Sequence, residues 1–140
     1  MDFSRRDLCL LLPALAAAAA RGAEDARLSS KAYRFDDLAV QASGENKFRG
    51  VFEGTTRTGL RLELHQTELA PGASPHPPHR HVHEELFLVR EGSVEVTIEG
   101  KTTRLGPGSV AFIASNDEHG IRNVGTSPAQ YFVLGVGSDK

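Results

Sequence analysis

Short apolar stretches, many of them alternating with polar residues, run through the chain from about residue 45 to residue 137. Leu60, Leu62 and Leu64 alternate with polar residues, and residues 94–98 alternate in the same way. A period of two is typical of a strand with one buried face. Residues 86–90 instead form a nearly continuous apolar run, which predicts a strand that is buried more completely.

Turn signals separate these runs, and the chain contains 14 Gly and 7 Pro among its 140 residues. Frequent turns favour many short strands over a few long helices. We therefore predict a single all-β domain over residues 45–140, an antiparallel and nearly closed barrel, preceded by a lead-in segment at 23–44. Its strands are expected at about residues 48–56, 60–65, 86–90, 94–98, 102–105, 110–113, 119–124 and 131–136.

The charge pattern excludes nucleic acid as an expected partner. The formal net charge is -2, and no run of Lys or Arg occurs beyond the N-terminus. Binding to a phosphate backbone requires a concentrated basic face, so small molecules are the expected ligands. The only cysteine is Cys9, which excludes an intramolecular disulfide. Cys9 lies in an N-terminal segment that we expect to be removed, which leaves nitrogen and oxygen ligands for any metal site.

The N-terminus has the order of a cleaved signal peptide: charged residues, an apolar run from Leu8 to Ala20, then small residues. That run is too short to span a bilayer, which takes roughly 20 residues. Arg5-Arg6 followed by Asp7-Leu8 resembles the twin-arginine export motif. We expect residues 1–22 to be removed, leaving a periplasmic or secreted protein without a stable membrane anchor. A helix that stays attached is the alternative.

Four of the six histidines, His76, His79, His81 and His83, lie within eight residues of one another. On an extended segment, residues two apart point to the same side, so His79 and His81 can aim at one point. Glu85 has the same parity, and two imidazoles with a carboxylate suit a first-row transition metal. A loose chelating loop on the surface is the alternative for this segment alone.

Two further patterns make this signal more specific. Residues 72–92 contain Gly72, the His79-x-His81 pair, Glu85 four residues later, and Gly92 seven beyond that. Residues 108–123 begin with Gly and end in His119-x-x-x-Asn123. In order and spacing these segments resemble the two motifs of the cupin superfamily, and the resemblance covers about residues 45–137.

The resemblance implies a jelly-roll barrel in which His79, His81, Glu85 and His119 hold one divalent transition metal ion: Mn, Fe, Ni, Co, Cu or Zn. The first motif has one residue more than usual before His79, and Ala114 and Asn116 replace the usual Pro and Gly. Asn tolerates positive φ well, so the turn can survive that change. A metal-free barrel that keeps the motif as a relic is the alternative.

Such a site favours a small, anionic, bidentate ligand. We expect a metal-dependent enzyme of the dioxygenase, decarboxylase or isomerase type, acting on a small organic acid or phenolic compound. The alternatives are a non-catalytic exported module that binds metal or a small ligand, and a sugar-binding or structural cupin. Cupins commonly dimerise through sheet edges, which makes a homodimer through residues 48–56 an expectation. The residues expected to line the pocket are Phe52, Leu86, Phe87, Phe112 and Tyr131.

The remaining polar residues of the motifs receive supporting roles. We expect His83 to contact one of the metal-ligating residues or to line the mouth of the site. We expect His76 to lie near the entrance of the site. His65 has the parity of Arg61 and Glu63 and is interpreted as a surface residue. Asn123 is expected to hold a strand or loop. The candidates for a separate acid or base are His83, His76 and Glu84.

Overall fold

A computed structural model describes residues 26–138, which form nine strands and one short 3-10 helix. The predicted signal peptide lies outside these residues. All eight predicted strands are present. No helix among the described residues is long and apolar enough to cross a membrane. The elements are η1 (Phe35–Asp37), β1 (Gln41–Ser43), β2 (Asn46–Thr55), β3 (Arg61–Leu69), β4 (Glu84–Glu91), β5 (Val94–Ile98), β6 (Lys101–Leu105), β7 (Val110–Ile113), β8 (His119–Asn123) and β9 (Ala129–Val136).

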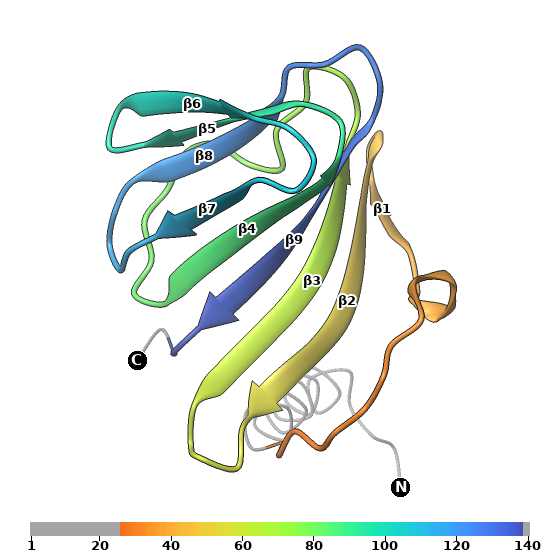
Figure 1. Ribbon diagram of the computed structural model, residues 1–140, viewed down its shortest axis with the longest axis vertical. Coiled ribbons are helices and arrows are strands. Elements are labelled where there is room, and N and C mark those ends of the chain that lie inside the picture. The colour runs from red at the N-terminus through yellow and green to blue at the C-terminus, as the bar shows by residue number, and fades with distance from the viewer. Residues whose placement is uncertain (1–25, 139–140) are drawn as a thin grey trace, which may run out of the picture.

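The strands form two antiparallel sheets, as Figure 1 shows. The larger sheet has the order β1-β2-β3-β9-β4-β7, and the smaller sheet has the order β6-β5-β8. Because β4 belongs to the large sheet and β8 to the small one, the two halves of the predicted site come from different sheets. The all-β prediction is confirmed.

The lead-in segment contacts the large sheet rather than standing free of it. Leu28 donates its backbone N–H to the Thr55 carbonyl at 2.9 Å, and Thr55 donates to the Ala26 carbonyl at 2.8 Å. Further along, β1 pairs with the beginning of β2. Sequence patterning missed β1, because three exposed residues carry no alternation of polar and apolar side chains.

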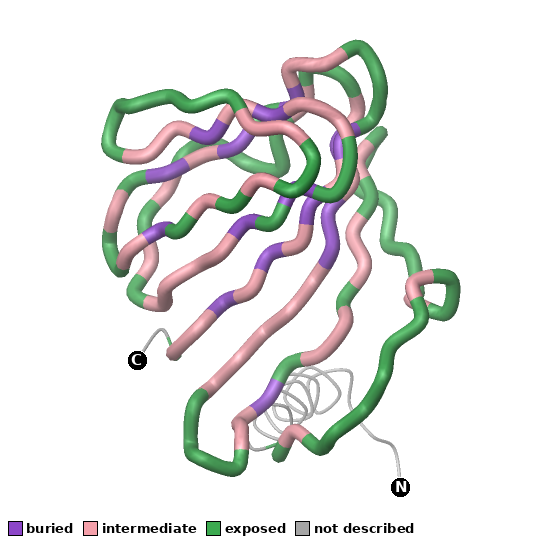
Figure 2. The backbone as a smooth tube through the Cα atoms, in the orientation of Figure 1, coloured by how far each residue is buried: buried purple, intermediate pink, exposed green. Residues whose placement is uncertain are grey.

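The core lies between the two sheets, where Figure 2 shows the buried positions gathered. Alternate residues of β9 are buried, in keeping with the period of a strand. The two buried aromatic residues, Phe87 and Tyr131, come from the large sheet, and the buried apolar residues of the small sheet are all aliphatic. The buried apolar residues are Leu69, Phe87, Val89, Val94, Val96, Ile113, Ile121, Ala129, Tyr131 and Val133.

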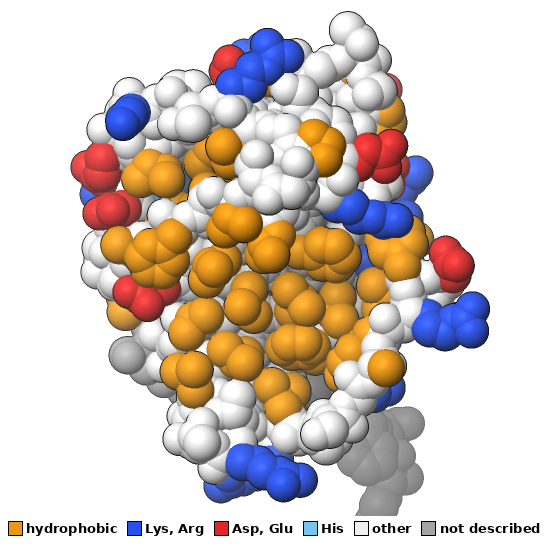
Figure 3. Space-filling view, in the orientation of Figure 1, with side chains coloured by type: hydrophobic (Ala, Val, Ile, Leu, Met, Phe, Trp, Pro, Cys, Tyr) orange, Lys and Arg blue, Asp and Glu red, His pale blue; other side chains and the backbone are white. Residues whose placement is uncertain are grey.

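The outer face of the large sheet is also apolar. Leu64, Leu134, Leu86 and Phe112 are paired in register across β3, β9, β4 and β7, so they share one face. That face is the outer one, because the Phe112 side chain is 55 % exposed. Figure 3 shows apolar side chains spread across it. The prediction that Phe52, Leu86 and Phe112 line the pocket is therefore wrong.

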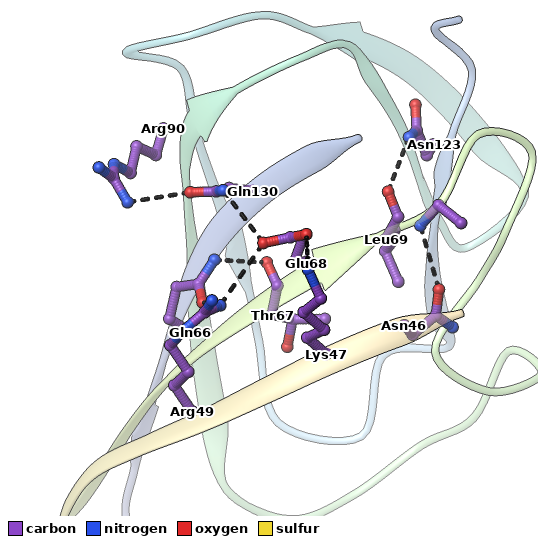
Figure 4. A network of polar contacts seen from close by, with 11 residues as sticks. Asn46, Lys47, Arg49, Gln66, Thr67, Glu68, Leu69, Arg90, Asn123 and Gln130 are labelled. Atoms are coloured by element: carbon purple, nitrogen blue, oxygen red, sulfur yellow. Dashed lines mark hydrogen bonds and ion pairs between the residues drawn. The ribbon is translucent and has the colours of Figure 1, made fainter. Parts of the chain in front are cut away.

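One end of this outer face is polar and carries a network of hydrogen bonds and ion pairs (Figure 4). Lys47 Nζ lies 3.0 Å from Glu68 Oε1, and Gln130 Nε2 donates to Glu68 Oε2 at 3.1 Å. Arg90 in turn donates to Gln130 Oε1 at 2.9 Å. The hydrogen bond from Lys47 lowers the pKa of the Glu68 carboxyl. The network joins β2, β3, β9 and β4 at the same level of the sheet.

Two turns depend on backbone conformations that most side chains disfavour. Asn116 has a φ of 65°, as the substitution of Asn for Gly in the second motif predicts. Gly92, between β4 and β5, has a φ of 82°, and a Cβ there would lie 2.7 Å from the Ala129 Cα. The chain therefore needs Gly92 both for its φ and for the close approach of the following loop.

Replacement of Gly92 by Ala should destabilise the protein by about 3 kcal/mol or more, since strain in φ and overpacking each cost about 1–3 kcal/mol. Gly100→Ala is the matched control, because Gly100 has a φ of 78° and nothing lies within 4 Å of its Cβ position. The control should lose only about 1–2 kcal/mol. Urea unfolding measures both values, and equal losses would contradict the close-approach argument.

Candidate metal centre

Hydrogen bonds between the two sheets bring the four predicted ligands together. His79 lies in the loop before β4, and His119 is the first residue of β8. Each of these two residues donates its backbone N–H to the carbonyl of the other at 3.0 Å. The Asn116 N–H donates to the His81 carbonyl at 2.8 Å, and Glu85 is the second residue of β4. The loop is thus held against the turn that precedes β8.

The side chains of these residues converge on one point. The ring centroids of His79, His81 and His119 lie 4.7–5.1 Å apart. The three imidazoles could hold a metal ion, since their ligand atoms lie within 4.8 Å of one another. Glu85 Oε1 lies 3.3 Å from His81 Nε2, and Glu85 Oε2 lies 3.3 Å from His119 Nε2.

Backbone carbonyls fix the tautomers of two of the imidazoles. His81 Nδ1 lies 2.8 Å from the His83 carbonyl oxygen, and His119 Nδ1 lies 2.9 Å from the Asp117 carbonyl oxygen. A carbonyl can only accept, so Nδ1 carries the hydrogen in both rings. In the neutral imidazoles, Nε2 therefore presents a lone pair to the centre of the cluster.

These residues fit a bound cation. His81 Nε2 and His119 Nε2 are buried and have no hydrogen-bond partner. Each faces a carboxylate oxygen of Glu85 at 3.3 Å, so acceptors face acceptors across the cluster. Only a proton or a metal ion between them would turn this repulsion into attraction. Burial, followed by the neighbouring imidazoles, lowers the pKa of His79, which favours its neutral, metal-binding form.

His83 lies directly beside this cluster. Its ring stacks on His81 with centroids 3.7 Å apart, and its Nε2 is 3.3 Å from Glu85 Oε1. Gly135 provides the space, since a Cβ there would lie 3.5 Å from the His83 ring. His81, His83 and Glu85 also form a second group that could hold a metal ion. His83 therefore contacts two predicted metal ligands, His81 and Glu85. The second group shares His81 with the first.

A cavity of about 320 Å³ lies beside the cluster, between the two sheets. Phe87 and Tyr131 line it, as predicted. Burial raises the pKa of Tyr131, and its hydroxyl is hydrogen-bonded to Thr67, so it remains protonated. The other lining residues are Ser43, Asn46, Lys47, Phe48, His65, Thr67, Pro75, His76, Glu85, His119, Gly120, Ile121 and Val133.

The interpretation of His65 as a surface residue is wrong. His65 lines the cavity, its side chain is only 19 % exposed, and its ring packs on Phe48 with centroids 4.6 Å apart. Its Nδ1 donates to Glu63 Oε1 at 2.8 Å, and this hydrogen bond lowers the pKa of Glu63. His65 and Glu63 do lie on the same face of β3, as their spacing predicts. That face, however, is directed into the barrel rather than toward solvent. The signal that sequence reasoning missed is the Glu63-x-His65 spacing itself.

Two other predicted positions agree with the structure. His76 is exposed, lines the cavity, and contacts the edge of the His79 ring at a centroid distance of 4.1 Å. Asn123 is fully buried and donates to the carbonyls of Leu69 and Ser127, while its Oδ1 accepts from the Gly125 N–H. Asn123 thus holds the loop after β8 and has no contact with the cluster.

Comparison with known proteins identifies a related family model. The model described as "Cupin domain" matches residues 65–135, which include all four predicted ligands. The match begins at His65 in β3 and ends in β9, so it includes strands of both sheets that enclose the cavity.

Curated relatives are similar over part of their length. L-ectoine synthase of Bordetella parapertussis is 34 % identical over 64 residues, or 45 % of this chain and 49 % of the relative. Dimethylsulfoniopropionate lyase DddW of Ruegeria pomeroyi is 35 % identical over 77 residues, or 55 % of this chain and 50 % of the relative. The chain spans about half the length of the curated relatives it matches.

Solved structures with low sequence identity share the fold. An RmlC-like cupin from Shewanella frigidimarina superposes with a TM-score of 0.67 at 17 % identity, covering 80 % of this chain and 95 % of that one. KdgF from Halomonas sp. also gives a TM-score of 0.67, at 21 % identity over 77 % of this chain and 95 % of that one. These similarities support the jelly-roll architecture.

The geometry predicts that the protein purifies with about one equivalent of a single transition metal, and that a His79→Ala/His119→Ala variant loses it. A ligand at 100 times its Kd stabilises a fold by about 2.7 kcal/mol, so the variant should also lose the rise in Tm on metal addition. Elemental mass spectrometry and thermal unfolding measure the two effects.

His76→Ala serves as the control, since His76 touches the cluster only at the edge of His79. It should keep the metal. Equal metal loss in the control and the double variant would indicate a loose chelating loop instead of an internal site.

Proposed function

The chain belongs to the cupin family, and from this premise we propose that it is a metal-dependent enzyme acting on a small organic acid or phenolic compound. One observation carries the proposal: a convergent three-histidine, one-glutamate cluster opens onto a largely apolar cavity of about 320 Å³. His79, His81, Glu85 and His119 would hold one divalent transition metal ion. Apolar cavities with a few convergent polar groups are typical of sites for small ligands.

The charge of the cluster favours an anionic ligand. Three neutral imidazoles and one carboxylate would leave a divalent ion with a net charge near +1. When bound, such an ion supplies Lewis-acid chemistry or a meeting point for a substrate and dioxygen. A small chelating acid suits this arrangement.

Glu63 and His65 form an acid–base pair that the sequence candidates, His83, His76 and Glu84, did not include. β3 and β4 lie on either side of β9, so His65 and Glu85 stand on strands about 10 Å apart. A small ligand bound near Glu85 would lie between them. With Nδ1 donating to Glu63, the lone pair of His65 Nε2 is available to take up a proton. The Glu63 carboxylate would then stabilise the imidazolium, as in other carboxylate–histidine pairs.

The names of the two curated relatives, a synthase and a lyase, support an enzyme over a binding module. The competing proposal is a module that binds a metal or small ligand without turnover, and the cluster alone would serve either role. The acid–base pair favours the enzyme, because simple sequestration has no need of a proton acceptor across the cavity. Export through residues 1–22 remains part of the proposal and agrees with either activity.

Substitution of His65 by Gln should lower turnover about 10²–10⁴-fold while metal content stays unchanged, since Gln forms hydrogen bonds but cannot take up a proton. Glu63→Gln should give a smaller loss. The measurement is consumption of a panel of small organic acids and phenols by the metal-loaded protein, followed by proton NMR.

Glu68→Gln is the matched control, because Glu68 lies on the same strand with its side chain on the outer face. It should leave turnover intact. Binding of panel compounds without any turnover would support the sequestration module, and an active His65→Gln variant would remove His65 from the reaction.

A further inference from the structure

An arginine lies between two of the predicted ligands, and its side chain contacts two other turns of the barrel. Arg80 separates His79 from His81 in the loop before β4. Its Nη1 donates to Glu99 Oε1 at 2.6 Å and to the Asn116 carbonyl at 2.7 Å. Hydrogen bonds between charged partners are stronger than those between neutral ones. One guanidinium therefore joins the loop of the ligands to two turns that follow it in the chain.

Glu99 belongs to the turn between β5 and β6. Ile98 pairs with Lys101 across this hairpin, so Glu99 and Gly100 form a loop of two residues. On its other side, Ile98 pairs with His119 in β8. The hairpin loop that carries Glu99 thus begins directly beside a predicted metal ligand.

The Glu99 carboxylate also holds the residue that precedes His119. Glu99 Oε1 accepts a second hydrogen bond, from the Glu118 backbone N–H at 2.6 Å. The Glu99 N–H in turn donates to the Glu118 carbonyl at 2.8 Å, and Arg80 Nη2 lies 3.8 Å from Glu118 Oε2. A single carboxylate oxygen therefore connects Arg80, between two ligands, to the backbone just before the third.

Both residues that accept hydrogen bonds from Arg80 have unusual backbone conformations. Among the described residues 26–138, only Glu99, with a φ of 46°, and Asn116, with a φ of 65°, are non-glycine residues with positive φ. Asn adopts this conformation readily, whereas Glu adopts it at a cost in backbone energy. Two-residue hairpin loops with positive φ at both positions favour Asn followed by Gly. The hairpin therefore has Glu where Asn would fit the backbone better.

Folding stability does not account for this choice of residue. The side chains of Arg80 and Glu99 are 51 % and 48 % exposed, and ion pairs as exposed as this one contribute little to the stability of a fold. Disfavoured backbone conformations that persist despite their cost are typical of functional sites. The value of Glu99 must therefore lie in what its carboxylate holds in place.

We propose that Glu99 and Arg80 are positioning residues that hold the loop of His79 and His81 against the start of β8, and thereby slow the loss of the metal ion. The inference rests on the metal site proposed above. Neither residue touches the ion, and both act through the backbone next to the ligands.

The pair adds an attachment beyond the backbone bridge between His79 and His119. That bridge holds the loop at one residue, whereas the Arg80–Glu99 pair holds it again one residue further along. Without the second attachment, the loop could turn about the bridge, and the three imidazoles would no longer converge. Supporting contacts around metal ligands typically contribute about 10- to 100-fold in metal affinity. We expect an effect near the lower end, because this contact acts through the backbone.

The first test separates metal affinity from folding stability, using a Glu99→Asn variant of the full chain. Asn suits the hairpin loop but lacks the length and charge to replace the carboxylate. The Tm of the metal-free variant should therefore equal or exceed that of the wild type, while its affinity for Co²⁺ should fall about 10-fold. The visible absorption of Co²⁺, in competition with a chelator, measures the affinity. Glu99→Gln keeps an oxygen at the Oε1 position and should retain most of the affinity.

The second test asks whether Glu99 and Arg80 act through one contact. Arg80→Ala should lower the affinity for Co²⁺ about as much as Glu99→Asn, and the double variant should lose no more than either single variant. Arg90→Ala is the matched control, because it removes an exposed guanidinium from the polar network on the outer face of the large sheet. It should bind Co²⁺ like the wild type.

Other outcomes would overturn the role of the pair. Unchanged affinity in Glu99→Asn would do so, as would additive losses in the double variant. A lower Tm of the metal-free Glu99→Asn variant would also do so, since Glu99 would then serve the fold. A wild-type protein that binds no Co²⁺ would instead overturn the proposed metal site, and the role of the pair with it.

Discussion

The pairing of His79 with His119 is the contact on which the rest of the site depends. It is a single antiparallel bridge between a loop and the first residue of β8, with two backbone hydrogen bonds of 3.0 Å. Through it, an irregular segment that leads into the large sheet is held against the small sheet. Each sheet contributes only part of the predicted ligand set, because Glu85 lies on β4 of the large sheet and His119 on β8 of the small sheet. The two sheets are therefore joined at the point where the four predicted metal ligands meet.

Each face of the large sheet has a distinct role. Its inner face carries polar groups in an otherwise apolar interior: His65 and Glu85 line the cavity, and Glu63 is hydrogen-bonded to His65. Its outer face is apolar where a monomer would normally be polar. This inversion reverses the usual rule that the polar side of an alternating strand faces solvent. It also places the Glu63–His65 pair on the same face as Glu85, so that the imidazole of His65 lines the cavity beside the histidine cluster.

Much of this molecule could be predicted from its sequence. The period of two located the strands, and the resemblance to the two cupin motifs identified His79, His81, Glu85 and His119, which the fold does bring together. What alternation cannot supply is the direction of each face. Alternation correctly grouped His65 with Glu63 but did not show that their face is directed into the barrel. The assignment of Leu86 and Phe112 to the pocket rested on their hydrophobicity alone, and both lie on the outer face. Strand β1 was missed because its pairing uses only backbone groups, which all sequences possess.

The tautomers of His81 and His119 are set by carbonyl oxygens of the main chain, at His83 and Asp117. The readiness of these rings to bind a cation is therefore a property of the local path of the backbone. Residues 83 and 117 can diverge during evolution without altering the polarity of the ring nitrogens, provided that the turns keep their shape. Related barrels could thus exchange the side chains around the cluster, and with them the reaction, while inheriting the same prepared donors.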